Sequence, residues 1–155
     1  SKETLGQTMN SVRHMGIAND GTVLTGQQFM GPSQERSELL AIKRPGQPFV
    51  AFPVADEQLQ AMGHYTASVA VHSELRLVAL TAPRGHRFFI WDIDSAELRL
   101  DAPLPDCAGV GPVADGFDVT SGQGRCRFYD CRQKELLAKP LELPAGLWDN
   151  HLHLI

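Results

Sequence analysis

The sequence predicts an all-β protein, a β-propeller fragment of about three four-stranded antiparallel blades. Short apolar segments alternate with turns rich in Gly, Pro, Asn and Asp, and no segment has the period of a long helix. One pattern also occurs twice. Thr81 and Thr120 are 39 residues apart, and Trp91 and Tyr129, each followed by Asp, are 38 apart. A period of about 40 residues with a Trp-Asp-like strand end is typical of a propeller blade.

The first blade is expected over residues 12–54. An Asp-Gly turn between two apolar runs predicts its opening hairpin, because this dipeptide adopts the positive φ angles of a tight turn. Its four strands are expected at residues 12–18, 22–29, 39–43 and 48–54. Residues 55–63 then show helical spacing and acidic residues near their start, which predicts one short helical turn between two blades.

The second and third blades follow at residues 67–104 and 108–144. The Leu-Pro pairs that end them are 39 residues apart, so the repeat extends to the blade exit. Their strands are expected at residues 67–72, 75–82, 87–93, 97–103, 108–114, 117–121, 125–131 and 136–143. The segment 87–93 is apolar on both faces, as expected for a sheet packed between two others. Residues 148–155 predict the start of a further strand.

Three blades do not close a ring. Each blade of a propeller buries its faces only against its neighbours, so an isolated run of three exposes two apolar sheet faces. We therefore interpret residues 1–155 as a single partial domain of a six- or seven-bladed ring. The expected partner is the missing propeller half or a second copy of the chain.

Composition narrows the classes of function. The chain of 155 residues has 43% hydrophobic residues and a net charge of −4, without the basic stripe that nucleic-acid binding needs. No apolar run approaches the roughly 18 residues of a membrane span. Cys107, Cys126 and Cys131 lack the spacing of a zinc site. Cys126 and Cys131 are expected on opposite faces of one strand, so we predict buried free thiols.

Several motifs, taken in order, carry a family resemblance. They are Ser-Val-Arg-His-Met at 11–15, Tyr-Thr-Ala-Ser-Val-Ala at 65–70, Thr-Ala-Pro-Arg-Gly at 81–85, Phe-Ile-Trp-Asp at 89–92, Thr-Ser-Gly-Gln-Gly at 120–124 and Trp-Asp-Asn-His-Leu at 148–152. Together they resemble the C-terminal part of a bacterial propeller family called domain of unknown function 1513. The resemblance implies a seven-bladed propeller about twice this length, a periplasmic location and an association with iron uptake. It implies no particular reaction.

The candidate site follows from propeller geometry. The innermost strand of each blade starts at one common face, so residues at these starts converge on the mouth of the channel. The predicted ligand-binding residues are Arg13, His14, Tyr65, Ser68, Trp148, Asp149, Asn150 and His151. His64, Asp106 and Cys107 lie at the same strand starts. Arg suits an anion, Tyr and Trp suit stacking, and His14 and His151, from different blades, are the predicted metal ligands.

Other motifs add no chemistry. Gly122-Gln123-Gly124 opens no helix and predicts a hairpin turn, and no Gly-x-Ser-x-Gly elbow is present. The basic turn 84–87 is interpreted as a solvated hairpin tip. We therefore predict a non-enzymatic binding or interaction module with a protein or small-molecule ligand at the channel mouth. The alternative is a metal-binding or enzymatic propeller with its site there. The sequence identifies no cofactor.

Overall fold

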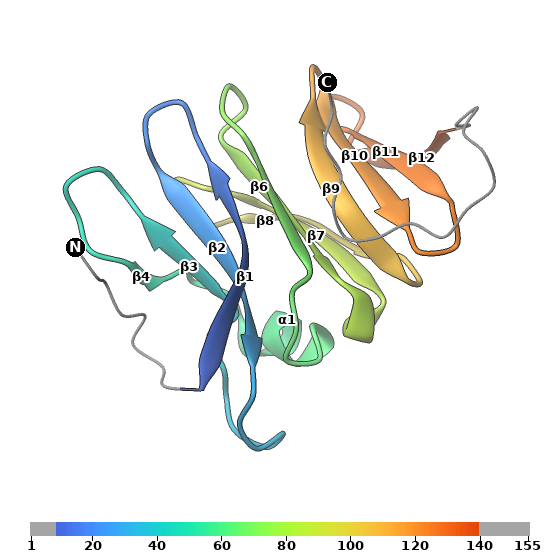
Figure 1. Ribbon diagram of the computed structural model, residues 1–155. Coiled ribbons are helices and arrows are strands. Elements are labelled where there is room, and N and C mark those ends of the chain that lie inside the picture. Colours follow the sequence, from blue (N-terminus) through green and yellow to red (C-terminus); the bar gives the residue numbers. More distant parts are fainter. Residues whose placement is uncertain (1–8, 140–155) are drawn as a thin grey trace.

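A computed structural model describes residues 9–139 and contains three four-stranded antiparallel sheets, arranged side by side as a fan (Figure 1). We number the sheets as blades in chain order. Blade 1 is formed by β1 (Asn10–Ile17), β2 (Val23–Phe29), β3 (Leu40–Lys43) and β4 (Val50–Ala51). Blade 2 is formed by β5 (Ser68–His72), β6 (Leu77–Ala82), β7 (Arg87–Asp92) and β8 (Leu98–Pro103). Blade 3 is formed by β9 (Cys107–Val113), β10 (Gly116–Ser121), β11 (Cys126–Asp130) and β12 (Glu135–Lys139).

Each sheet is a meander whose strands are ordered as they occur in the chain. Strand β5 contacts both β1 and β9, so the first strands of the three blades lie next to one another as the innermost strands of a propeller do. The prediction of an all-β propeller fragment with three four-stranded blades is confirmed.

The structure differs from the sequence analysis in the length of one strand. Strand β4 covers only Val50–Ala51, where residues 48–54 were expected to be extended. Pro48 and Pro53 flank it, and proline has no N–H group to donate to a sheet. Helix α1 (Asp56–Ala61) follows in the expected place, with Leu59 buried. The predicted strand at 148–155 lies outside the described residues.

Blade 2 contributes side chains to two hydrophobic cores, one shared with blade 1 and one shared with blade 3. Along β7, Phe89 and Trp91 face the core shared with blade 1, whereas Phe88 and Ile90 face the core shared with blade 3. This alternation explains why both faces of the segment are apolar. The contact with blade 1 is close, because a Cβ atom on Gly26 would lie 2.6 Å from the Val69 side chain.

The repeated aspartates have a structural role. The Oδ1 atom of Asp92 accepts hydrogen bonds from the backbone N–H groups of Asp94 (3.0 Å) and Ser95 (2.9 Å). The Oδ1 atom of Asp130 accepts the equivalent hydrogen bonds from the N–H groups of Arg132 (2.8 Å) and Gln133 (3.0 Å). The Asp of each Trp-Asp-like strand end therefore closes the turn after the third strand of its blade.

Ion pairs join the turns of blades 1 and 2. The guanidinium group of Arg76, in the β5–β6 turn, lies 3.0 Å from Asp20 in the β1–β2 turn and 2.9 Å from Asp94 in the β7–β8 turn. Arg44, in the β3–β4 turn, reaches Asp94 at 3.3 Å. The hydrogen bond from Arg76 lowers the pKa of Asp94. These four side chains hold the turn ends of two blades together.

On the side of blade 1 that faces away from blade 2, several large apolar side chains are exposed. Val12, Met15 and Ile17 of β1 are 44%, 59% and 60% exposed, which is unusual for large apolar side chains. Blade 1 thus shows the uncovered apolar face that is expected of an incomplete propeller. Among residues 9–139, no helix has the length and apolar character needed to cross a membrane.

Candidate functional site

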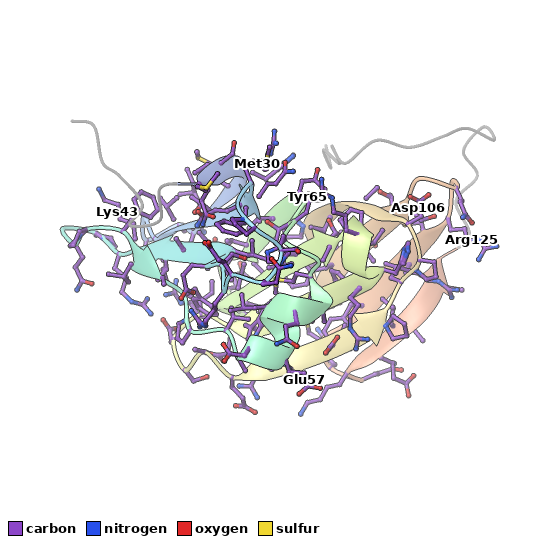
Figure 2. All side chains as sticks on the ribbon, turned by 90° about the horizontal axis from the view of Figure 1, so that it is seen from below. Met30, Lys43, Glu57, Tyr65, Asp106 and Arg125 are labelled. Atoms are coloured by element: carbon purple, nitrogen blue, oxygen red, sulfur yellow. The ribbon has the colours of Figure 1, made fainter. Side chains whose placement is uncertain are left out.

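One end of the fan carries the starts of β5 and β9 together with the end of β2. Figure 2 looks onto the molecule from below and shows Met30, Tyr65 and Asp106 spread along one side of it, with Glu57 of α1 on the opposite side. Met30 follows β2, Tyr65 precedes β5, and Asp106 precedes β9. The strand starts of three blades therefore share one surface, as the propeller geometry requires.

Two arginines on this surface are linked through Gln28 and Tyr65. The Nη2 atom of Arg13, on β1, donates a hydrogen bond to Oε1 of Gln28. The backbone of Gln28 forms an isolated β-bridge with Tyr65. The guanidinium carbon of Arg84 lies 5.0 Å from the centre of the Tyr65 ring, within the range of a cation–π contact. We call Arg13, Gln28, Tyr65 and Arg84 the cationic row.

The position of Arg84 depends on close backbone packing. Arg84 belongs to the 3-10 turn η1 (Pro83–Gly85), which lies against the end of α1. A Cβ atom on Gly85 would lie 1.7 Å from the carbonyl oxygen of Ala61, so this position accepts only glycine. Arg84 is exposed, as expected from the sequence, and it also stacks on the Tyr65 ring.

Both ring nitrogens of His64 make hydrogen bonds to the loop at residues 30–39. Its Nε2 atom lies 2.9 Å from the carbonyl oxygen of Ser33, and its Nδ1 atom lies 3.0 Å from Oγ of the buried Ser37. A carbonyl oxygen only accepts, so Nε2 carries the proton, and in the neutral ring Nδ1 accepts from the Ser37 hydroxyl group. Both nitrogens of His64 therefore fix the loop at residues 30–39.

This loop and α1 enclose a pocket of about 310 Å³, which the sequence analysis did not predict. Arg36 lines the pocket and donates from Nε to Asp56 of α1 at 2.7 Å. Arg36 also pairs with Glu38. Two carboxylates thus offset the charge of this arginine. The pocket depends on loop contacts that span about 20 to 30 residues of sequence and carry no repeat signal.

Ser68 lies at the boundary between two blades. Its side chain is buried, and its Oγ atom accepts a hydrogen bond from the backbone N–H of Val110 at 3.2 Å. Its own N–H donates to Oγ1 of Thr81 at 3.1 Å, and that hydroxyl group donates to the carbonyl oxygen of Ala108 at 2.6 Å. The structure thus uses Ser68 to connect blades 2 and 3 and does not bring its hydroxyl group into the cationic row.

The remaining predicted residues are spread over this end. His14 is half-buried on β1, next to Arg13. Asp106 has a φ of 55° and donates its N–H to Nδ1 of His86 at 3.4 Å. Cys107 is buried, and burial raises its pKa to about 12. The other predicted ligand-binding residues, Trp148, Asp149, Asn150 and His151, lie outside the described part of the chain.

Of the two predicted metal ligands, His14 lies among the residues that the structure describes and His151 lies outside them. Within residues 9–139, no group of three or more His, Cys, Asp and Glu side chains is arranged to hold a metal ion. None of the three cysteines forms a disulfide within residues 9–139, and Cys107 and Cys126 are buried whereas Cys131 is partly buried.

Three meandering sheets with adjacent innermost strands, and strand starts gathered at one end, define a segment of a β-propeller. The particular family is shown by sequence. A family model described as "Protein of unknown function (DUF1513)" matches residues 1–155, and the chain belongs to that family. No curated protein is significantly similar to the chain.

Solved structures with this fold are WD40 and other propeller proteins. The WD40 repeats of RRP9 align with a TM-score of 0.59 and 13% identity over 81% of this chain and 35% of that one. The C-terminal WD40 domain of Sif2 aligns with a TM-score of 0.59 and 13% identity over 87% and 35%. The extracellular domain of the one component system BT4673 from B. thetaiotaomicron aligns with a TM-score of 0.66 and 9% identity, over 95% of this chain and 18% of that one. The chain spans about a third of the first of these structures, and the likeness concerns the fold alone.

Proposed function

We propose that this protein is a non-enzymatic binding module that takes an anionic ligand on the cationic row. The observation that carries the proposal is that a series of contacts through Gln28 and Tyr65 links Arg13 of blade 1 to Arg84 of blade 2. A guanidinium group is always charged and matches the geometry of carboxylate and phosphate, while the Tyr65 ring offers an apolar face. A small molecule or protein segment with a carboxylate or phosphate group has this chemistry.

Two groups near the strand starts that could take part in a reaction already have hydrogen-bond partners. The imidazole of His64 uses both nitrogens to hold the loop at residues 30–39. The Cys107 thiol donates to the carbonyl oxygen of Arg87 and stays protonated, because burial raises its pKa to about 12. These contacts favour binding over catalysis. His14, which follows Arg13 on β1, remains part of the proposed site, and residues 148–151 remain in it as predictions from the sequence.

The setting that we propose is the periplasm, with a link to iron handling. Its support is the family resemblance, since members of that family often carry export signals and occur beside iron-uptake proteins. Cell fractionation of the full-length protein tests the location. Recovery with periplasmic marker proteins is expected, and recovery only with cytosolic markers would remove this part of the proposal.

The ligand class is tested by calorimetric titration of the full-length protein with citrate and, separately, with inorganic phosphate. Arg13→Gln and Arg84→Gln are each expected to weaken binding of the responding anion about tenfold or more, since each removes a charge-assisted contact. Arg125→Gln is the matched control, because Arg125 is exposed at the same end but belongs to blade 3. Equal losses in all three variants, or no binding of either anion, would contradict an anion site on the cationic row.

A further inference from the structure

Two exposed methionines lie opposite each other beside the cationic row. The register of β1 and β2 places Asn10 opposite Phe29, and the pairing continues for one residue, because the N–H of Met30 donates to the carbonyl oxygen of Met9 at 2.9 Å. Met9 and Met30 are 47% and 59% exposed. Two large apolar side chains from neighbouring strands thus reach the surface at one place, whereas exposed apolar residues are ordinarily scattered singly.

The methionines share a face with the cationic row. Alternate residues of a strand point to the same side of a sheet, so the Met30 side chain lies on the face of Gln28. Gln28 is opposite Ser11 of β1 on one side and forms the bridge with Tyr65 on the other. Residues directly opposite each other on paired strands also share a face. Met9 and Tyr65 therefore belong to this face too, and Figure 2 shows Met30 and Tyr65 on the same side of the molecule.

The two arginines of the cationic row are not neutralised by carboxylates of the described residues. Among residues 9–139, every other arginine of blades 1 and 2 forms an ion pair. The partners of Arg13 and Arg84 are the neutral side chains of Gln28 and Tyr65. Both arginines are exposed. An acidic group from another molecule can therefore pair with them without displacing a carboxylate of this chain.

This combination of residue types is typical of a protein interface. Methionine, tyrosine and arginine are enriched at interfaces relative to the rest of the protein surface. The flexible thioether of methionine also adapts to apolar side chains of different shapes. We call Met9, Met30 and the cationic row together the methionine–arginine face.

The extent of this face suits a segment of polypeptide. Its residues come from β1, β2 and the segment before β5, and paired strands are about 4.8 Å apart, so it extends about 10 Å across the strands. Met30 is two residues from Gln28, which is about 7 Å along the strand. A single carboxylate or phosphate covers one part of such a face, whereas about four residues of extended chain reach the arginines and the methionines together.

We propose that the methionine–arginine face binds an extended segment of another protein in which an apolar residue stands two positions from an acidic one. This inference rests on the proposed binding of an anion by the cationic row and names the class of partner. The acidic side chains pair with Arg13 and Arg84, and the apolar side chains pack on Met9 and Met30. Side chains two positions apart in an extended segment point to one side and lie about 7 Å from each other, which matches the spacing of Gln28 and Met30.

Calorimetric titration of the full-length protein with two synthetic peptides of identical composition tests this spacing. The first peptide repeats Glu-Ser-Leu-Ser three times, so that Glu and Leu point to the same side of an extended chain. The second repeats Glu-Leu-Ser-Ser three times, which places Glu and Leu on opposite sides. The first peptide is expected to bind at least about fivefold more tightly. Salt near 1 M should weaken the binding of both, because it screens the charges.

Two methionine variants locate the apolar contact. Met30→Gln is expected to weaken binding of the first peptide about fivefold and to remove most of the difference between the peptides, since it replaces an apolar surface by a polar amide of similar size. Met15→Gln is the matched control, because Met15 is also 59% exposed but pairs with Thr25, on the opposite face of blade 1 from Gln28. Neither variant should change the titration with citrate or phosphate.

The outcomes separate this inference from the proposed function. Equal affinities for the two peptides, or equal effects of Met30→Gln and Met15→Gln, would overturn the inference. The anion site would still stand if citrate or phosphate binding remains sensitive to Arg13→Gln and Arg84→Gln. If neither the peptides nor the small anions bind, the proposed function fails and the inference fails with it.

Discussion

The hydroxyl group of Thr81 donates a hydrogen bond to the carbonyl oxygen of Ala108 across the boundary between blades 2 and 3, at 2.6 Å. The hydroxyl oxygen of Thr81 in turn accepts a hydrogen bond from the N–H of Ser68 at 3.1 Å. Thr120 occupies the next repeat position, but its hydroxyl group bonds to Gly109 within blade 3. The repeated threonine therefore secures its own blade in both cases and adds a contact between blades only at Thr81.

Replacing Thr81 by valine is expected to lower the free energy of unfolding by about 1–3 kcal/mol, because a buried N–H and a buried carbonyl lose their partner. Chemical denaturation measures this. Thr25→Val is the matched control, since the buried Thr25 hydroxyl has no partner among the described residues and its removal should be neutral or stabilising. Equal effects of the two substitutions would contradict the role of Thr81.

Gly26→Ala is expected to destabilise the protein by about 1–3 kcal/mol, since the added Cβ would lie 2.6 Å from the side chains of Thr66 and Val69. Thermal unfolding measures the loss. Gly46→Asn is the control: Gly46 has a φ of 73° and no neighbour within 4 Å, and asparagine tolerates that backbone conformation. A comparable loss at Gly46 would mean that glycine flexibility, and not contact between blades 1 and 2, sets the result.

Asp92 is expected to make the free energy of unfolding depend on pH in the acidic range. The N–H of Ser95, with help from Arg99, lowers the pKa of Asp92 to about 2. An unfolded aspartate has a pKa near 3.9, so the contribution of Asp92 is present above about pH 4 and is lost as the pH falls toward 2. Asp92→Asn should be less stable than the wild type at pH 7, with a difference that shrinks between pH 4 and 2. Gln123→Asn, at an exposed position without a titratable group, should show no such narrowing.

Metal analysis of the purified full-length protein separates the two functions considered for the channel mouth. A binding module is expected to contain no stoichiometric iron or copper. The metal-site alternative predicts about one ion per chain, lost in His14→Ala and in His151→Ala but retained in His153→Ala. Such a pattern would replace the binding proposal by the metal-site alternative.

The sequence predicted the scaffold well because each strand has its own local signal. The alternation within β7 and the turn-closing Asp92 and Asp130 lie within short segments and recur after one blade, so the repeat could be read directly. Strand β4 was overestimated, since its flanking prolines shorten the ladder.

The site was only partly predictable. Arg13 and Tyr65 could be placed at strand starts from topology. Their link depends on a backbone bridge between Gln28 and Tyr65, and the stacking of Arg84 depends on how η1 packs against α1. The pocket beside His64 depends on Ser33 and Ser37, which are 31 and 27 residues away in the chain. Such contacts between unrepeated segments leave no periodic trace in a sequence.

The ion pairs between the turns of blades 1 and 2 bear on how these blades could be moved into another propeller. Asp20 and Arg44 of blade 1 both find their opposite charges in blade 2, at Arg76 and Asp94. Blade 1 transplanted alone would leave these four side chains without their partners in the neighbouring blade. The smallest unit that can be transplanted here without compensating substitutions in the turns is thus a pair of blades, although the structural repeat is one.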